Sequence, residues 1–111
     1  MNLRSLALLP WALAGAVQAA APARHHVDLE CEAVYLPARS TWVRQVEIDY
    51  DRRKVTAVRI DGVTAYSFSV HGTVILTAVD NERIQIDAAA QSWQSDFRGL
   101  AQSQGHCERI P

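Results

Sequence analysis

Alternation of hydrophobic and polar residues with a period of two dominates the chain after residue 26. In the segment 27–36, the apolar positions Val27, Leu29, Cys31 and Ala33 alternate with three acidic residues, Asp28, Glu30 and Glu32. A period of two places successive side chains on opposite faces of a β-strand, so the segment predicts a strand with one buried and one solvated face. Further segments of this kind are 42–50, 55–60, 63–70, 73–79 and 83–86. In 42–50, the residues expected on one face are Trp42, Val46, Ile48 and Tyr50. The segment 73–79 is more continuously apolar, which is typical of a central strand buried on both faces.

Short turn sequences separate these segments. Asp61-Gly62 is the strongest of them, because a two-residue type I′ turn needs positive φ at both positions and favours this pair. It predicts a hairpin in which Tyr66, Phe68 and Val70 of the second strand face inward. Other turns are expected at 51–54, 71–72 and 80–81.

The segment 88–98 has two interpretations. It can be a helix that begins at Asp87 as an N-cap and ends at Gly99, or a turn at 88–90 followed by a strand over 93–97. We favour the strand, because the last strand of a meander (106–110) needs a neighbour.

Together these elements predict an all-β fold, a small antiparallel meander of seven to eight strands that forms a barrel or a flattened sandwich. Two cysteines in an exported chain allow one intramolecular pairing, so we expect a Cys31–Cys107 disulfide between the ends of the domain. Pairing of the first strand with the last would place these cysteines together and remove the exposed sheet edges.

The N-terminus predicts export. A single basic residue, Arg4, precedes an apolar run and then small residues, which is the pattern of a signal peptide with cleavage after Ala19. The run is short for a membrane span and Pro10 interrupts it. We therefore expect a signal peptide at 1–19, a flexible arm at 20–26 and one β domain at 27–111. Cys31 lies too far from the run for a lipoprotein, so no membrane anchor remains and the chain is expected to be periplasmic or secreted.

The charge of the chain argues against a nucleic-acid or anionic-lipid partner. The formal net charge is −1, and no block of like charges forms a basic patch or tail.

The C-terminal half resembles the end of small exported bacterial β proteins of unassigned role. The resemblance is carried by Ile86-Asp87, then a strand containing Trp93 and Phe97, then Gly105-His106-Cys107. It implies a fold and a compartment, and no activity. In overall plan the chain is also similar to periplasmic inhibitors of C-type lysozyme, but their Ser-Gly…Tyr loop has no match, since the nearest segment, 65–67, lacks the glycine.

Candidate chemical groups are few. The pair His25-His26 falls in the expected arm, where a metal site is not expected, because adjacent strand residues point to opposite faces. The carboxylates Asp80 and Glu82, like Asp49 and Asp51, flank turns and are expected to be solvated. No nucleophile, base and orienting group can be assembled, so we expect no enzyme, no catalytic residue, no cofactor and no metal.

The aromatic residues are expected mainly in the core. Trp42 and Trp93 are the candidate ligand-binding residues, as tryptophans that could line a barrel mouth and stack on a ligand. Two functions remain open: a binding module for a protein partner, with inhibition of a host or envelope enzyme as one form, and a small-molecule binder that uses the barrel interior.

Overall fold

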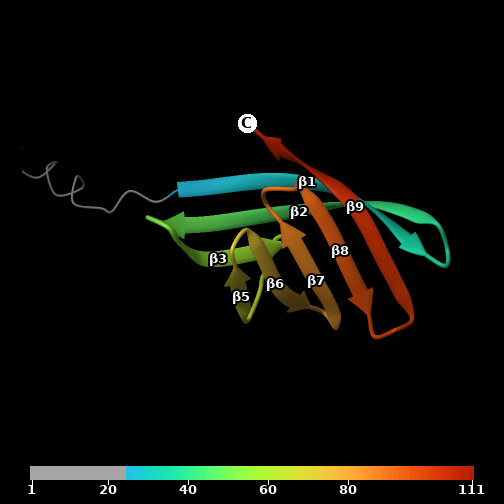
Figure 1. Cartoon of the computed structure of the whole chain (residues 1–111). Coiled ribbons are helices and arrows are strands. Elements are labelled where there is room, and N and C mark those ends of the chain that lie inside the picture. Colours follow the sequence, from blue (N-terminus) through green and yellow to red (C-terminus); the bar gives the residue numbers. More distant parts are fainter. Residues whose placement is uncertain (1–24) are drawn as a thin grey trace, which may run out of the picture.

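The computed structural model describes residues 25–111, which form nine strands in one antiparallel sheet. Figure 1 shows the sheet curled into a half-barrel, with spatial order β4-β3-β2-β1-β9-β8-β7-β6-β5. The strands are β1 (His25–Leu36), β2 (Ser40–Asp51), β3 (Lys54–Ile60), β4 (Val63–Thr64), β5 (Phe68–His71), β6 (Val74–Val79), β7 (Glu82–Asp87), β8 (Ser92–Phe97) and β9 (Ala101–Ile110). The all-β antiparallel fold is therefore confirmed. The predicted signal peptide lies outside the described residues.

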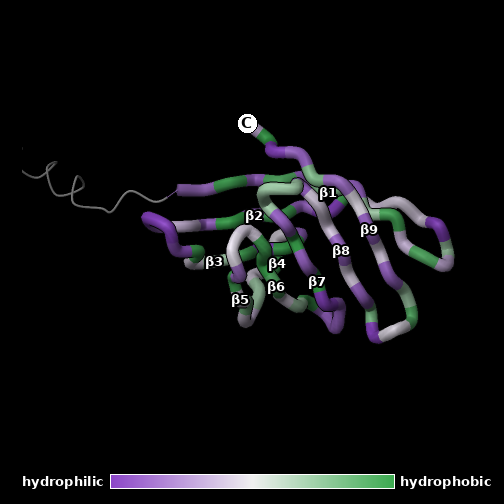
Figure 2. Tube along the Cα trace, viewed as in Figure 1, coloured by the Kyte–Doolittle hydropathy of each residue, from purple (hydrophilic) through white to green (hydrophobic). Residues whose placement is uncertain are grey.

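The core is one cluster on the inner face of the curled sheet. The alternation that predicted the strands also sorts their side chains, and Figure 2 shows hydrophobic and hydrophilic residues alternating along them. Buried residues come from both halves of the sheet, β1–β4 and β5–β9, so each half covers the apolar face of the other. The largest fully buried side chains are Trp93, Ile60, Ile84, Ile86, Val46 and Val58.

The first strand pairs with the last, as predicted. In the β1–β9 register Cys31 lies directly opposite Cys107, and the two form a disulfide with their Cα atoms 3.9 Å apart. Both cysteines are fully buried in the core cluster. The bond therefore joins the two halves of the sheet at its central pair of strands.

The predicted strand 63–70 is divided into two, which gives nine strands where seven or eight were expected. Its first part, β4, pairs with β3, and its second part, β5, pairs with β6 at the opposite edge of the sheet. The chain crosses between the edges at 65–67, where Ala65 N–H donates to Val58 O and Thr77 Oγ1 donates to Ser67 O. The sheet thus keeps two edges, β4 and β5, and the expectation that first-to-last pairing would remove all edges is wrong.

This crossing also changes which side chains face inward. Tyr66 is fully exposed and Val70 is exposed, whereas only Phe68 packs against the core. The prediction that all three face inward is wrong, because the strand is interrupted and its two-residue period is broken. β6 alternates as well, with Ile75 buried and Leu76 exposed, so it is not a strand buried on both faces.

The strand interpretation of 88–98 is confirmed. A turn at 88–91 leads into β8, which pairs with β7 and β9. Asp87 Oδ1 accepts hydrogen bonds from the backbone N–H of Ala89 and Ala90 and from Thr73 Oγ1. A helix N-cap makes the same kind of contact, which explains why the sequence allowed both interpretations.

The predicted type I′ turn is present, since both Asp61 (φ 53°) and Gly62 (φ 84°) have positive φ. A different glycine is required by packing. Gly105 lies between Ala33 and Trp93 in the register, and a Cβ on it would lie 1.8 Å from the carbonyl oxygen of Glu32. The backbones of β1 and β9 can therefore pack this closely only with glycine at position 105.

Candidate functional site

At the hairpin end of the sheet, β2 extends beyond its neighbour β3. β3 pairs with β2 only from Val46 to Asp51, so the segment Ser40–Gln45 has β1 as its single neighbouring strand within residues 25–111. Figure 1 shows this end of the hairpin projecting past β8 and β9. β1 itself remains paired with β9 as far as Leu36, so the open side belongs to β2. We call the segment Ser40–Gln45 the free edge.

The backbone of the free edge has a defined orientation. Gln45 N–H donates to Asp61 Oδ1 at 2.8 Å, and Gln45 O accepts from Asp61 N–H at 2.8 Å, on the side away from β1. Backbone groups in a strand alternate in direction, so Val43 and Thr41 also direct N–H and C=O away from β1. Asp61 therefore closes one end of the edge, and two residues beyond it offer unpaired backbone donors and acceptors.

Large hydrophobic side chains are exposed on both faces of this hairpin end. On the inner face Trp42 is 61% exposed, with its ring 5.9 Å from that of Tyr35 at an interplanar angle of 57°. On the outer face Val34, Leu36 and Val43 are exposed. Soluble proteins usually protect such a free edge with charged residues, or cover it with another part of the chain, when exposed apolar residues flank it.

A buried polar network lies between Trp42 and the core. The side chains of Arg44 and Glu82 are each only 10% exposed, and Arg44 Nη1 donates to Glu82 Oε1 at 2.9 Å. Arg44 Nε donates to Asp61 Oδ2 at 2.6 Å, and Nη1 also contacts the Tyr35 hydroxyl. Tyr35 in turn donates to Glu82 Oε2 at 2.5 Å. The guanidinium is thus held by groups from β1, β7 and the Asp61-Gly62 turn.

The network continues to Trp93. Ser95 Oγ donates to Glu82 Oε2 at 2.6 Å and lies 2.5 Å from Ser103 Oγ, which accepts the Trp93 indole N–H at 2.8 Å. The Arg44 guanidinium also lies 5.0 Å from the centre of the Trp93 ring, within cation–π range. The indole is fully buried and its one polar group is satisfied.

The structure therefore places the two candidate tryptophans on the same inner face, linked through Tyr35 and Arg44, but in different environments. Trp42 has an accessible ring at the projecting end of the hairpin. Trp93 has no exposed surface and belongs to the core cluster, so its ring is not accessible to a ligand in this structure.

Burial and hydrogen bonding oppose each other at these ionisable groups. Burial alone would raise the pKa of Glu82, but hydrogen bonds from Ser95, Tyr35 and Arg44 outweigh it and lower that pKa. Burial likewise opposes the charged form of Arg44, and the carboxylates of Glu82 and Asp61 more than restore it, so its pKa is raised. The pair is ionised at neutral pH.

The sequence interpretation missed this network. Glu82 was expected to be solvated beside a turn, and it is buried, because it occupies the inward register of β7 together with Ile84 and Ile86. Arg44 occupies the inward register of β2 between Trp42 and Val46. A charged residue at a position that alternation assigns to the core is the signal that could have identified both.

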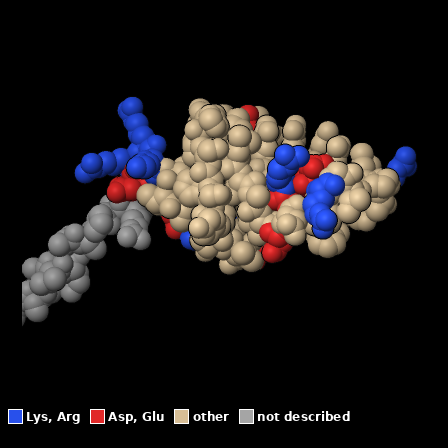
Figure 3. Space-filling model, turned by 90° about the horizontal axis from the view of Figure 1, so that it is seen from below, with Lys and Arg blue, Asp and Glu red and all other residues tan. Residues whose placement is uncertain are grey.

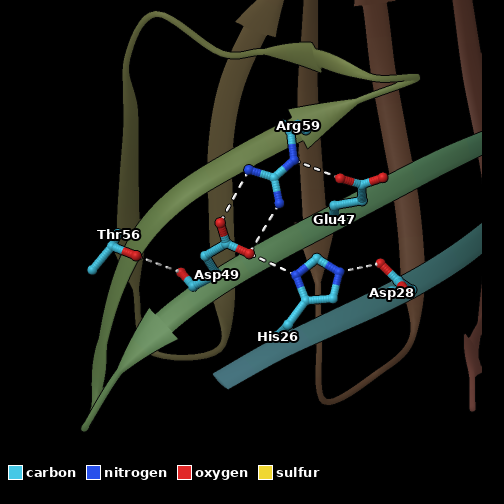
Figure 4. Close-up of polar contacts among 6 residues, drawn as sticks. All are labelled: His26, Asp28, Glu47, Asp49, Thr56 and Arg59. Carbon is cyan, nitrogen blue, oxygen red and sulfur yellow. Dashed lines mark hydrogen bonds and ion pairs between the residues drawn. The ribbon is translucent and has the colours of Figure 1, made fainter. Parts of the chain in front are cut away.

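A second polar cluster lies on the outer face, across β1, β2 and β3 (Figure 4). His26 Nδ1 is 2.6 Å from Asp49 Oδ1, and Nε2 is 2.6 Å from Asp28 Oδ1. Arg59 donates to both oxygens of Asp49 at 2.9 and 3.0 Å and to Glu47 Oε1 at 2.5 Å. Carboxylates only accept, so an imidazole bonded to one at each nitrogen is protonated.

The pKa values follow these contacts. Hydrogen bonding to Asp49 and then to Asp28 raises the pKa of His26 above 6.5. Hydrogen bonds from Arg59 and then His26 lower the pKa of Asp49 to about 2. His25 and His26 belong to β1, so the strand begins two residues before the predicted boundary at Val27. As expected for strand neighbours, they face opposite ways, and His25 stacks on Tyr50 with ring centres 5.0 Å apart.

The described residues also form hollows. A shallow groove of about 1070 Å³ runs along the outer face of β6–β9, where Gln85, Gln94 and Gln104 lie side by side in the register. A smaller cleft of about 280 Å³ opens between the two halves of the sheet near Tyr50, and its lining includes Val27 and Ile75. The centre of the half-barrel is filled by the core side chains.

Within residues 25–111 no three His, Cys, Asp or Glu side chains are grouped so that they could hold a metal ion. The same part of the chain contains no helix long and apolar enough to cross a membrane. Comparison of the chain with protein-family models, curated proteins and solved structures found no match.

Proposed function

We propose that this chain is an exported interaction module that binds a protein partner at the projecting end of the β1–β2 hairpin. The observation that carries the proposal is the free edge, whose outward backbone groups at Thr41 and Val43 have no partner within residues 25–111. An extended segment of another chain can add to such an edge as a further strand, with backbone hydrogen bonds for affinity and adjacent side chains for selectivity.

The side chains around the edge suit this mode of binding. Trp42 offers a large aromatic surface that is held in place by Tyr35, and Val43 offers an apolar surface on the opposite face. Aromatic residues of this kind provide much of the binding energy in protein interfaces. The edge segment 40–43 carries no charge, so it places no ionic demand on the added strand.

The proposed location follows from the predicted export. The predicted signal peptide and the Cys31–Cys107 disulfide both suit an oxidising compartment, so we propose a periplasmic or secreted location. The disulfide lies in the pair of strands from which the hairpin projects, and it therefore keeps β1 in place as a support for the edge.

In-cell photo-crosslinking tests the proposal. A photoreactive amino acid at position 43 is expected to give a discrete protein adduct, whereas the same group at Gln94, on the outer face of β8, is not. Thr41→Pro removes an outward N–H without touching the β1 ladder, and it should abolish the adduct. Thr41→Ala keeps that N–H and should retain the adduct. An adduct that survives Thr41→Pro, or none at all, contradicts binding at the free edge.

The 280 Å³ cleft favours a second candidate, a small apolar ligand between the two halves of the sheet. Its volume lies just below the usual range for ligand pockets, about 300–1,000 Å³. Ile75→Trp would fill part of the cleft. Saturable binding of a fluorescent fatty-acid probe that this substitution abolishes would support the candidate, and no binding to the unmodified protein would exclude it.

A further inference from the structure

The free edge of β2 is complementary to itself when two copies run antiparallel. We infer that the partner of this edge is a second copy of the same chain, in a dimer with a two-fold axis at Trp42. The inference rests on the proposed function, because it assigns the occupant of the same edge.

The register follows from the backbone directions. Thr41 and Val43 direct their N–H and C=O groups outward, so each must face an outward residue of the partner strand. An antiparallel pairing of Thr41 with the partner copy's Val43 satisfies this and makes two hydrogen bonds, and its symmetric equivalent makes two more. Trp42 then lies opposite Trp42 of the other copy.

The two tryptophans would meet at a position suited to close contact. A directly opposite, non-hydrogen-bonded pair on antiparallel strands has Cβ atoms about 5 Å apart. Both Trp42 side chains lie on the inner face of their own sheet and are exposed there. Pairing across the axis would therefore cover an apolar ring that the single chain leaves in water.

The two ends of the edge are complementary in charge. Arg39 precedes the edge at the hairpin turn, and its side chain is exposed and has no ion pair within residues 25–111. Figure 3 shows basic side chains (blue) at the hairpin end of the molecule. Gln45 at the other end lies beside two carboxylates. That of Asp61 is already paired with Arg44, whereas that of Glu30 has no ion pair within residues 25–111. Asp61 fills the strand position beside Gln45, so the hairpin turn of the other copy, which holds Arg39, lies next to Gln45 and not in its ladder. Each Arg39 then comes close to the Glu30 carboxylate of its partner.

The edge also has the right length for this pairing and no more. Asp61 occupies the outward backbone groups of Gln45, and the turn at 37–39 ends the strand on the other side. A longer peptide would meet Asp61 before it could extend its ladder along β2. The two-fold arrangement uses the edge of both copies and leaves no strand end for further growth, so it closes as a dimer.

After the predicted cleavage, the chain's own N-terminal arm would be too short to reach the edge. With cleavage after Ala19, the arm before β1 has five residues, which span at most about 18 Å when fully extended. The arm joins β1 at His25, which pairs with Tyr50, whereas the edge lies around Trp42, which pairs with Ala33. Eight residues of strand separate His25 from Ala33, about 27 Å.

Sedimentation equilibrium of the mature, oxidised protein tests the inference over a range of concentrations. An interface of this size belongs with weak, transient ones, so we expect a concentration-dependent monomer–dimer equilibrium. Thr41→Pro should leave a monomer at every concentration, and Thr41→Ala should keep the dimer. A far-ultraviolet circular dichroism spectrum and a cooperative thermal melt like those of the natural chain show that each variant is folded.

The register has its own test. Trp42→Cys places two thiols opposite each other across the axis, so mild oxidation should give a covalent dimer on a non-reducing gel. Val43→Cys is the matched control, because its side chain faces away and lies opposite Thr41 of the other copy, and it should crosslink at least tenfold less. Equal crosslinking of the two variants would overturn the register.

The outcomes separate the inference from the proposed function. A protein that stays monomeric, while position 43 still forms an adduct with a different protein that Thr41→Pro abolishes, overturns the dimer and leaves the interaction module intact. A monomer with no adduct overturns both. A dimer that Thr41→Pro does not affect is formed elsewhere and also overturns the inference.

Discussion

Replacing Glu82 with glutamine should destabilise the protein strongly, although the substitution changes little in shape. Glu82 and Arg44 are each 10% exposed, and breaking one partner of a buried ion pair costs about 3–5 kcal/mol. Asp61, whose side chain is 41% exposed, still holds the guanidinium after the substitution. We therefore expect the lower end, about 3 kcal/mol. For a domain of this size the melting temperature should fall by roughly 12–24 °C.

Glu47→Gln is the matched control for this substitution. Glu47 also bonds an arginine, Arg59, but the two side chains are 37% and 24% exposed, and Asp49 keeps Arg59 paired. An exposed pair of this kind contributes less than about 1 kcal/mol. Urea unfolding of the oxidised protein, followed by far-ultraviolet circular dichroism, measures both variants. Equal losses in the two would refute the argument that burial makes the Arg44 network costly to break.

The same reasoning predicts a pH dependence. The folded state lowers the pKa of Glu82, so its contribution is fully present above its ordinary pKa of 4.5 and is lost as the pH falls through the lowered value. The free-energy difference between the natural chain and Glu82→Gln should therefore shrink in acid. Removing both charges, as Arg44→Leu with Glu82→Leu, should cost less than Glu82→Gln alone, because no buried charge is left without a partner.

Three further perturbations test other parts of the fold. Gly105→Ala should lower the free energy of unfolding by about 3 kcal/mol or more, because its methyl carbon would overlap the Glu32 carbonyl and force β1 and β9 apart; urea unfolding measures this, and a loss below 1 kcal/mol would contradict it. Cys31→Ser opens a crosslink between residues 76 positions apart and should lower stability by about 4 kcal/mol by chain entropy, which a thermal melt with and without reductant would show. The raised pKa of His26 means that its contribution is fully present below pH 6.5 and is lost as the pH rises through the raised value; Asp49→Asn should lower that pKa in an NMR titration, and an unchanged pKa would refute the contact.

The sequence predicted the strands where the two-residue period is unbroken and the turns have characteristic residues. β1 alternates strictly, β2 and β3 alternate on either side of a register shift at Asp49/Tyr50, and Asp61-Gly62 adopts the positive φ values its residues favour. The cysteine pairing followed from the presence of only two cysteines in the chain. These features are local or depend on simple counting, so one sequence is enough to derive them.

The crossing at 65–67 could not be predicted in the same way. The segment 63–70 alternates as a single strand would, and nothing local shows that its two parts pair with opposite edges of the sheet. That division depends on how far the sheet curls, which the packing of both halves around the core determines. Exposure of Tyr66 and Val70 follows from it, so these errors have one common cause.

The sequence predicted only part of the candidate site. Trp42 was chosen from its place beside a polar segment, and the structure exposes it at the end of the projecting hairpin. Its status as a ligand-binding residue stays a prediction, as does that of Trp93. The free edge was not foreseen, although the predicted strands 42–50 and 55–60 already differ in length. Whether another strand covers the longer one depends on the order of strands in the sheet, which the sequence does not show.

Asp61 connects the stability of the fold to the length of the free edge. One of its oxygens accepts the backbone N–H of Gln45 and the other accepts Arg44 Nε, so the side chain that ends the edge also holds the buried guanidinium. The residue stands there because the type I′ turn requires positive φ at its first position, which aspartate tolerates. The turn that closes the β3–β4 hairpin therefore also determines where the unpaired part of β2 ends. The buried network and the exposed edge are consequently two parts of one arrangement, and a substitution at either would be expected to affect the other through this side chain.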